Sequence, residues 1–326
     1  MLRASRAPSP LPAPRTRTRF VRRPPVPLRA ADLPEQVLLP VDLRRARADV
    51  AHALSIYRAP LWAGVPLVVT VHDVVPLLWP ERYLRTGAVH RLLYAAARRA
   101  RRILCPSHAA SADVVDRLGV PVERVDVVPE GVDPRFAPGA AGDLVASPYV
   151  LFVGGLADAD PRKDVGGLID AFGRWARAGD RPERLVLAGR TGPATAALRR
   201  RAEAAGAPIV FTDFVDERDL PGLYRGASCL VSATRYEGFG LPMLEAIACG
   251  TPVAGYAVAA LPEVCGPGAD LVAPGDADAL MAAVQRLCDD GAHRAALAAA
   301  GREHARAFTW RRTAEQTWAA YAKARA

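Results

Sequence analysis

The sequence has 326 residues, enough to bury a large core and to form about two domains. Apolar residues make up 51% of it, but no stretch reaches the roughly 18 uninterrupted apolar residues of a membrane-spanning helix, so a soluble globular protein is expected. The formal net charge of +9 would favour a nucleic-acid or membrane partner only if the charge lay on the folded part.

The excess positive charge lies in residues 1–30. This segment holds eight Arg, seven Pro and no acidic residue, whereas the remaining chain has 35 basic and 34 acidic residues. Such a composition buries too little apolar surface to fold, and the segment lacks the apolar stretch of a secretory signal. We therefore predict a disordered Pro/Arg-rich tail over residues 1–30, a nearly neutral folded part and no nucleic-acid partner.

The cysteines stand far apart and never form a C-x-x-C pair, so the sequence indicates neither a zinc site nor a disulfide framework. A reduced cytoplasmic location fits this pattern. The five are Cys105, Cys229, Cys249, Cys265 and Cys288.

Short apolar runs in the first half indicate strands, with a helix near residues 86–99. The runs are 48–54, 66–74, 101–107 and 125–131. Right-handed crossovers between such strands give a parallel sheet, so residues 31–145 are predicted to form an N-terminal Rossmann-like domain.

The second half alternates buried strands with amphipathic helices, which is typical of a doubly wound α/β domain over residues 146–308. Two such domains would face each other across a cleft, and ligands of open parallel sheets lie beyond the carboxyl ends of the strands. The predicted strands are 148–156, 184–189, 208–214, 228–234, 252–257 and 269–274, and the predicted helices are 164–178, 193–205, 216–226, 241–249 and further helices from 276 onward.

The run RYEGFGLPMLEAIACG, residues 235–250, places two glutamates on either side of a glycine-rich turn between a predicted strand and helix. Gly238 and Gly240 allow a ligand to approach the backbone closely, and Pro242 suits the first turn of a helix. Free amides and the helix dipole favour an anion such as a phosphate at this helix start.

Glu245 lies one turn inside that helix, and helical side chains tilt toward the N-terminus, so its carboxylate should point back toward the anion. A carboxylate beside a phosphate is useful when it accepts hydrogen bonds from a neighbouring diol such as a ribose. Glu237, before the helix, could bind a second sugar in the same way. The alternative is that both glutamates are solvated surface residues.

The run RYEGFGLPMLEAIACGTPV resembles the E-x7-E signature of retaining family 4 glycosyltransferases, which have the GT-B fold and use nucleotide-sugar donors. The similarity covers roughly residues 35–322. It extends to FVGGLADADPRKDVGGLIDAF (152–172), FTDFVDERDLPGLYRGASCLVSAT (211–234), VVTVHDVVPLLWPE (68–81), CPSHAASADV (105–114) and VVPEGVD (127–133).

The resemblance implies that Glu245 holds the nucleotide ribose and Glu237 the transferred sugar. It implies a donor diphosphate bound by Lys163 with Arg162 beside it, in a site completed by the backbone of Gly155, Gly238, Phe239, Gly240 and Leu241. By resemblance, residues 309–326 form a helix that packs back toward the N-terminal domain.

Two further observations concern catalysis. The chain has 41 Arg and only two Lys, Lys163 and Lys323, so a lysine at position 163 indicates a need for a compact ammonium group. His72 ends a predicted strand and resembles the family histidine near the reacting sugar; a structural hydrogen-bonding role is the alternative. Asp158 and Asp160 spell D-x-D, but a solvated loop is expected there, and neither metal nor other cofactor is predicted.

Three departures from the family pattern stand out. The first β-turn-α unit, whose glycine loop faces the donor, is absent, and we expect the acceptor sheet to be less stable without it. Leu156 replaces a basic residue, and Glu130 replaces an asparagine. The absent unit leaves two explanations: an upstream start, or a degenerate protein that binds nucleotide-sugar without transferring it.

The predicted function is retaining transfer of a hexose, with mannose suggested by the PRKD and HD elements, from a nucleotide-sugar to a glycan or lipid-linked acceptor. A cell-envelope glycan acceptor would be consistent with peripheral association of the protein with the inner face of the membrane. A sugar-nucleotide epimerase of the same fold is the second alternative. A dinucleotide oxidoreductase is disfavoured because Gly154 and Gly155 lack the third glycine of G-x-G-x-x-G.

Overall fold

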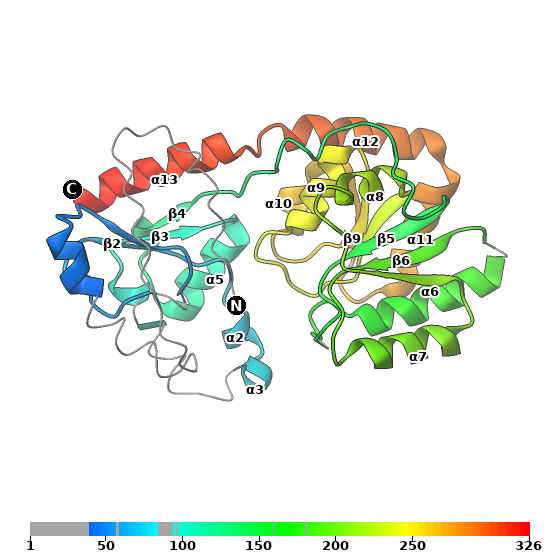
Figure 1. Ribbon diagram of the computed structural model, residues 1–326, viewed down its shortest axis with the longest axis horizontal. Coiled ribbons are helices and arrows are strands. Elements are labelled where there is room, and N and C mark those ends of the chain that lie inside the picture. The colour runs from blue at the N-terminus through cyan, green and yellow to red at the C-terminus, as the bar shows by residue number, and fades with distance from the viewer. Residues whose placement is uncertain (1–38, 57–58, 84–93, 96, 159, 180) are drawn as a thin grey trace.

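The computed structural model describes residues 39–326 except 57–58, 84–93, 96, 159 and 180, so the predicted disordered tail lies outside the described residues. The chain forms two α/β bodies that lie side by side (Figure 1). The described residues form a four-stranded sheet in the N-terminal body and a six-stranded sheet in the C-terminal body. All strand pairs in both sheets are parallel, as predicted for the α/β class.

The C-terminal sheet has the strand order β10-β9-β8-β5-β6-β7, in which the direction of winding reverses between β5 and β8. This is the doubly wound order of dinucleotide-binding folds, and its ligands lie beyond the carboxyl ends of the two strands at the reversal. The strands are β5 (Tyr149–Val153), β6 (Arg184–Ala188), β7 (Ile209–Asp213), β8 (Cys229–Ser232), β9 (Val253–Tyr256) and β10 (Ala269–Val272).

Burial on both faces explains why the central strands are continuous apolar runs. In β5, Val150 and Phe152 pack into the core on one side of the sheet, and Tyr149 and Leu151 pack into the core on the other. The covering helices are α6 (Val165–Gly179), α7 (Thr195–Ala205), α8 (Leu220–Gly226), α9 (Leu241–Cys249), α10 (Leu261–Cys265), α11 (Ala277–Asp289) and α12 (Gly291–Ala305).

The N-terminal sheet has the order β1-β2-β3-β4, which follows the sequence without a reversal. Residues 39–45 are helical and precede the sheet. The strands are β1 (Ala51–Ala53), β2 (Leu67–Thr70), β3 (Arg102–Cys105) and β4 (Val125–Val127), and the helices between them include α2 (Val75–Leu78), α3 (Pro80–Tyr83) and α5 (His108–Leu118).

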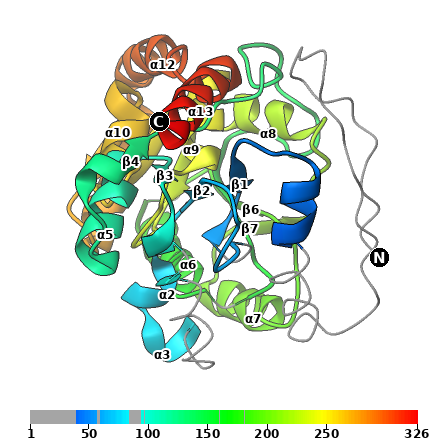
Figure 2. The same ribbon diagram turned by 90° about the vertical axis from the view of Figure 1, so that its left-hand side faces the viewer.

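Helix α13 (Trp310–Arg325) returns from the C-terminal body and lies along the N-terminal sheet near β2 and β3 (Figures 1 and 2). Ala320 and Ala324 are buried in a small core with Val68 and Leu104. The Lys323 ammonium contacts Asp126 at 2.6 Å. Small side chains on one helix face therefore allow the end of the chain to pack closely on the first sheet.

Several elements of the N-terminal body differ from the predictions. The apolar runs at 66–74 and 125–131 continue past their strands, which end at Thr70 and Val127. Helix α5 was not predicted from periodicity, although Ser107 caps it by accepting a hydrogen bond from the Ala110 amide at 3.0 Å. Of the predicted helix near 86–99, residues 94–95 and 97–99 are helical, and most of the rest lies outside the described residues.

Candidate active site

The carboxyl ends of β5 and β8 bring two loops together at the reversal of strand order. One loop runs from residue 154 to 164 and leads into α6; the other runs from residue 233 to 240 and leads into α9. The hydroxyl of Thr234, a fully buried side chain, lies 3.1 Å from the carbonyl oxygen of Arg162. The Arg235 amide donates to the same carbonyl at 2.6 Å, so the two loops are tied together through their backbones.

Lys163 and Glu237 form an ion pair between these loops. The side chains are 22% and 12% exposed, respectively, so both remain accessible from solvent. The Thr234 hydroxyl lies 3.2 Å from the same carboxylate oxygen of Glu237. An ammonium group has three donors and a carboxylate has two acceptor oxygens, so both side chains keep hydrogen-bonding capacity for a ligand.

Arg162, the neighbour of Lys163, is held by Asp160. Its guanidinium contacts Asp160 Oδ2 at 2.7 Å, and its backbone amide donates to Asp160 Oδ1 at 3.0 Å. This pair shapes the turn that precedes α6. Asp160 therefore orients the Arg162 side chain. Among the described residues, no group of three or more potential metal ligands occurs.

The start of α9 has the features of an anion site. Gly240 occupies the N-cap with φ of 109°, a left-handed conformation that favours glycine, and no side chain caps the helix. No described residue accepts a hydrogen bond from the amides of Phe239, Gly240 or Leu241. Unsatisfied amides and the helix dipole together attract negative charge.

Glu245, one turn into α9, accepts a hydrogen bond from the buried hydroxyl of Tyr224 in α8 at 2.8 Å. Burial raises the pKa of Glu245 to about 7, while the Tyr224 hydrogen bond acts in the opposite direction. Arg135 and Asp133, in the segment between the bodies, and Glu217, before α8, also influence this carboxyl. Glu245 and Glu237 therefore have different partners and environments, although one helix start separates them.

The loop before α9 rests directly on the N-terminal body. A Cβ added to Gly238 would lie 2.1 Å from the carbonyl oxygen of His72, so only glycine fits this contact. The buried Ser107 hydroxyl donates to the Gly238 carbonyl at 2.6 Å. We call this contact between the 236–238 loop and the N-terminal body the interdomain junction.

Two further interactions join the two bodies, one within the interdomain junction and one from α10 beside it. The Tyr236 hydroxyl donates to Asp113 of α5 at 2.7 Å. Glu263 of α10 accepts hydrogen bonds from the His108 and Ala109 amides, both at 3.0 Å, at the start of α5. The start of α5 is therefore capped by both Ser107 and a carboxylate from the other body.

His72 follows β2 and is half exposed beside the junction. Its Nδ1 lies 3.0 Å from Glu130 Oε1, and its Nε2 lies 3.1 Å from the Leu54 carbonyl oxygen. The hydrogen bond to Glu130 is the largest cause that raises the pKa of His72. Asp73 instead accepts a hydrogen bond from the amide of Val75, the first residue of α2, at 2.9 Å.

The glycine turn after β5 divides into an exposed and a buried part. Gly155 is exposed, and a Cβ added there would meet no atom within 4 Å. Leu156 is buried in the core of the C-terminal body and donates its amide to the Arg190 carbonyl at 3.0 Å. Core packing is thus the physical reason for an apolar residue at position 156.

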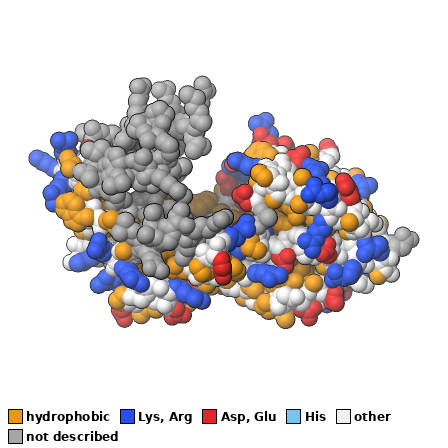
Figure 3. Space-filling model, turned by 90° about the horizontal axis from the view of Figure 1, so that it is seen from below, with side chains coloured by type: hydrophobic (Ala, Val, Ile, Leu, Met, Phe, Trp, Pro, Cys, Tyr) orange, Lys and Arg blue, Asp and Glu red, His pale blue; other side chains and the backbone are white. Residues whose placement is uncertain are grey.

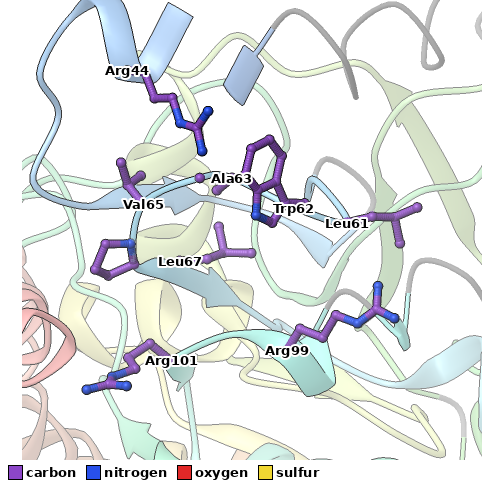
Figure 4. Close-up of a pocket in the computed structure, with 10 residues that line it drawn as sticks. Arg44, Leu61, Trp62, Ala63, Val65, Leu67, Arg99 and Arg101 are labelled. Atoms are coloured by element: carbon purple, nitrogen blue, oxygen red, sulfur yellow. The ribbon is translucent and has the colours of Figure 1, made fainter. Parts of the chain in front are cut away.

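Two surface features lie away from this site. A cavity of about 460 Å³ at the amino end of β2 is lined by Arg44, Trp62, Arg99 and Arg101, but the Arg99 and Arg101 guanidinium groups point in opposite directions (Figure 4). It therefore lacks converging donors. Basic and acidic side chains are mixed over the visible face of the C-terminal body (Figure 3).

None of the helices in the described ranges has the length and apolar character needed to cross a membrane.

Several residues of the site carried no recognisable sequence signal. Tyr224 is an ordinary core tyrosine in the sequence, and its contact with Glu245 depends on how α8 packs against α9. Thr234 and Ser107 are small polar residues at strand ends, and only the three-dimensional arrangement reveals their partners. Glu130 was visible as a departure from the family pattern, but its pairing with His72 was not.

Comparison with known proteins identifies the family to which the chain belongs. Residues 147–290 match the family described as Glycosyl transferases group 1, and residues 2–136 match Glycosyltransferase Family 4. The O-antigen chain mannosyltransferase B of Escherichia coli is 28% identical over 78% of this chain and 69% of its own length. The MMP alpha-(1->4)-mannosyltransferase of Mycolicibacterium hassiacum is 32% identical over 80% of this chain and 66% of its own length.

A D-inositol 3-phosphate glycosyltransferase from an Arthrobacter species is 30% identical over 86% of this chain and 70% of its own length. Among solved structures, the sucrose-phosphate synthase of Thermosynechococcus elongatus superposes with a TM-score of 0.70 at 25% identity, covering 88% of this chain and 78% of that one. Anabaena HepE, solved with UDP, gives 0.73 at 20% identity, covering 89% and 82%. The chain belongs to the family 4 glycosyltransferases of GT-B fold and is a hexosyltransferase.

Proposed function

We propose that this protein is a retaining transferase that moves mannose from a nucleotide-sugar to a glycan or lipid-linked acceptor. The observation that carries the proposal is the Lys163–Glu237 pair, which lies at the strand-order reversal just before the uncapped start of α9. The Lys163 cation, the Glu237 carboxylate and the free amides at the start of α9 match the diphosphate and hydroxyl groups of a nucleotide-sugar.

In this proposal the donor occupies both sides of the α9 start. The diphosphate lies against the amides of Phe239, Gly240 and Leu241 and against Lys163, and Glu237 accepts hydrogen bonds from the transferred sugar. Glu245 accepts hydrogen bonds from the ribose. Its raised pKa means that ribose binding strengthens as pH rises through about 7, because the ionised carboxylate is the better acceptor.

Transfer breaks the bond between the anomeric carbon and a phosphate oxygen, so negative charge grows on the leaving diphosphate. Lys163 and the α9 amides stabilise this charge in place, which is commonly the largest contribution to rate in such sites. We assign this role to these groups rather than to a metal, because Arg162 already engages Asp160 of the D-x-D sequence. The leaving oxygen takes the proton of the acceptor hydroxyl that attacks from the same face.

Mannose is favoured by two relatives that are named mannosyltransferases, from Escherichia coli and Mycolicibacterium hassiacum. Solved proteins of the same fold include Anabaena HepE with UDP-glucose, so the nucleotide and sugar require a direct test. A lipid-linked acceptor would bring the protein to the inner face of the membrane in the cytoplasm. Sedimentation with vesicles that carry the acceptor lipid would detect this association, and recovery in the supernatant would contradict it.

The experiment that tests the proposed function is a donor panel of GDP-mannose, UDP-glucose and UDP-GlcNAc, offered with alkyl and aryl α-mannosides as acceptors. We expect nucleoside diphosphate release that requires both GDP-mannose and an acceptor, and an α-linked product by proton NMR. A β-linked product would overturn retention, and turnover with only UDP-sugars would overturn mannose. Binding without turnover would indicate a degenerate protein, and an isomerised donor without acceptor would indicate an epimerase.

A further inference from the structure

Three strands of the N-terminal sheet end around His72. Leu54 follows β1, His72 follows β2 and Glu130 follows β4, and the imidazole of His72 bonds to the other two. Both partners are acceptors at neutral pH, because one is a carboxylate and the other a backbone carbonyl. A neutral imidazole carries a single N–H and can donate to only one of them.

The imidazolium form has two N–H groups and satisfies both contacts. A protonated Glu130 beside a neutral His72 would contain the same number of protons. Imidazole is the stronger base by about two pKa units, so the proton belongs on His72. The geometry therefore favours a charged imidazole whose two N–H groups point to Glu130 Oε1 and to the Leu54 carbonyl.

His52 provides an internal contrast, because both of its ring nitrogens are also bonded. Its partners are the hydroxyls of Tyr321, at 2.7 Å, and Thr70, at 2.8 Å. Hydroxyls donate as well as accept, so a neutral His52 keeps both hydrogen bonds. Burial lowers the pKa of His52 to about 4, and His72 adds to this effect. The chemistry of their partners therefore distinguishes His72 from His52.

The charged groups around His72 act in the same direction. Glu130 and Asp73 both favour the charged imidazole, and Glu130 has the larger effect. His52, the basic neighbour, is neutral at physiological pH because of its lowered pKa. The His72 side chain is 50% exposed and that of Glu130 is 18% exposed, so the imidazole is the more accessible of the two from solvent.

We propose that Glu130 is a positioning residue that keeps His72 as a doubly donating imidazolium, which fastens the ends of β1 and β4 together beside the interdomain junction. His72 is then not a general base for the acceptor hydroxyl, because neither ring nitrogen has a free lone pair. Instead, the hydrogen bonds of His72 to Glu130 and Leu54 fix the shape of the N-terminal side of the site, where the proposed acceptor binds. The inference rests on the proposed function only in that it assumes an acceptor substrate. The protonation state of His72 does not depend on that function.

The sign of the pH dependence follows from this arrangement. A histidine whose folded-state pKa is raised contributes stabilisation that is complete below its unfolded pKa, about 6.5, and is lost as pH rises through the folded-state value. We therefore expect acceptor binding to weaken as pH rises through the folded-state pKa of His72. Donor binding should not weaken over this range.

The test combines NMR and kinetics on the full chain. Long-range proton–nitrogen spectra of the imidazole rings are recorded from pH 5 to 9, with the His72 signal assigned from His72→Gln. We expect His72 to titrate above 6.5 in the unchanged protein and at a lower pH in Glu130→Gln. Glu130→Asn, which restores the residue of the family pattern, should give the same shift and covers the possibility that the glutamine variant folds poorly.

In steady-state kinetics, the pH at which kcat/KM for the acceptor falls on the alkaline side should be lower in both variants, by the same amount as the His72 titration. The donor KM should be unchanged. A His72 titration that Glu130→Gln leaves in place would overturn the inference, as would an NMR shift without movement of the kinetic limit. If no donor supports transfer, the NMR titration still decides the protonation of His72. Failure of the proposed function is thereby distinguished from failure of this inference.

Discussion

The two sheets of this protein place functional groups at their carboxyl ends in different ways. In the C-terminal sheet the strand order reverses between β5 and β8, and the loops that follow these strands bring Lys163 and Glu237 together before the uncapped start of α9. In the N-terminal sheet the strands follow one another in sequence order, and the His72 imidazole bonds to both Glu130 and the Leu54 carbonyl.

From this difference we expect the two bodies to have different roles in the reaction. The C-terminal body presents electrostatic groups with unused hydrogen-bonding capacity, as catalysis by charge stabilisation requires. The groups at the carboxyl edge of the N-terminal sheet are largely satisfied by each other, so this body is expected to shape and close the site. Substitutions in the two bodies should therefore affect different kinetic parameters.

The largest effect is expected for Lys163→Gln. Removing one preorganised cation from the leaving diphosphate should lower kcat by about 10²–10³-fold, and it also leaves Glu237 without its ion-pair partner. Initial rates of nucleoside diphosphate release measure the change.

The matched control for that substitution is Lys323→Gln, which changes the other lysine of the chain. Lys323 is 56% exposed and pairs with Asp126 beside the N-terminal sheet, so its loss should alter kcat less than about twofold. Equal losses in both variants would mean that Lys163 acts through stability rather than through the donor, and the comparison between the two bodies would fail.

Gly238→Ala tests whether the junction, rather than either body alone, completes the site. A methyl group at this position would meet the His72 carbonyl oxygen at 2.1 Å, so the two bodies must move apart. Forcing an atom into a packed contact costs about 1–3 kcal/mol, and we expect kcat/KM to fall about tenfold or more. Thermal unfolding and steady-state kinetics together measure both effects.

Gly155→Ala is the matched control, because its added methyl group would meet no atom within 4 Å. The melting temperature should be unchanged, while the donor KM should rise if the exposed turn after β5 faces the diphosphate. A melting temperature that falls as much in Gly155→Ala as in Gly238→Ala would remove the argument for a specific contact at the junction.

The two bodies also differ in how much of them could be predicted from sequence. Long apolar runs and regular helix periods specified the six strands of the C-terminal sheet, and Leu241–Cys249 was predicted with its observed bounds. In the N-terminal body, helix α5 was not predicted from periodicity. In both bodies the predicted strands run past the observed ends: 66–74 includes His72 and Asp73 after β2, and 148–156 includes Gly154 and Gly155 after β5. Short elements give periodicity too few positions to define an end.

The site residues also differ in whether their contacts could be predicted from sequence. Lys163, Glu237 and the α9 glycines belong to local motifs, so their proximity follows from strand–turn–helix units on adjacent strands. The Tyr224–Glu245 and Glu130–His72 contacts join residues that are distant in sequence, and which side chains meet is decided by packing. Local sequence patterns contain no information on such pairs.

The smallest effect is expected for Glu245→Gln, measured as stability rather than activity. Burial raises the pKa of Glu245 to about 7, from an ordinary value of 4.5, so ionising this carboxyl destabilises the folded protein. The cost grows as pH rises from about 4.5 to 7 and is constant above that. Glutamine keeps a hydrogen-bond acceptor for Tyr224 without the charge, so the variant should gain about 1–2 kcal/mol at pH 8 and almost nothing near pH 4.5.

Glu237→Gln is the control for this prediction, because Glu237 lies in an ion pair with Lys163 that glutamine would remove. It should show no gain in stability at pH 8. Urea unfolding of both variants at the two pH values separates the carboxylates, although both should weaken donor binding. If Glu245→Gln were no more stable than the unchanged protein at pH 8, then Glu245 would be solvated in the folded state. Its place beside Tyr224 as a desolvated acceptor for the ribose would then be wrong.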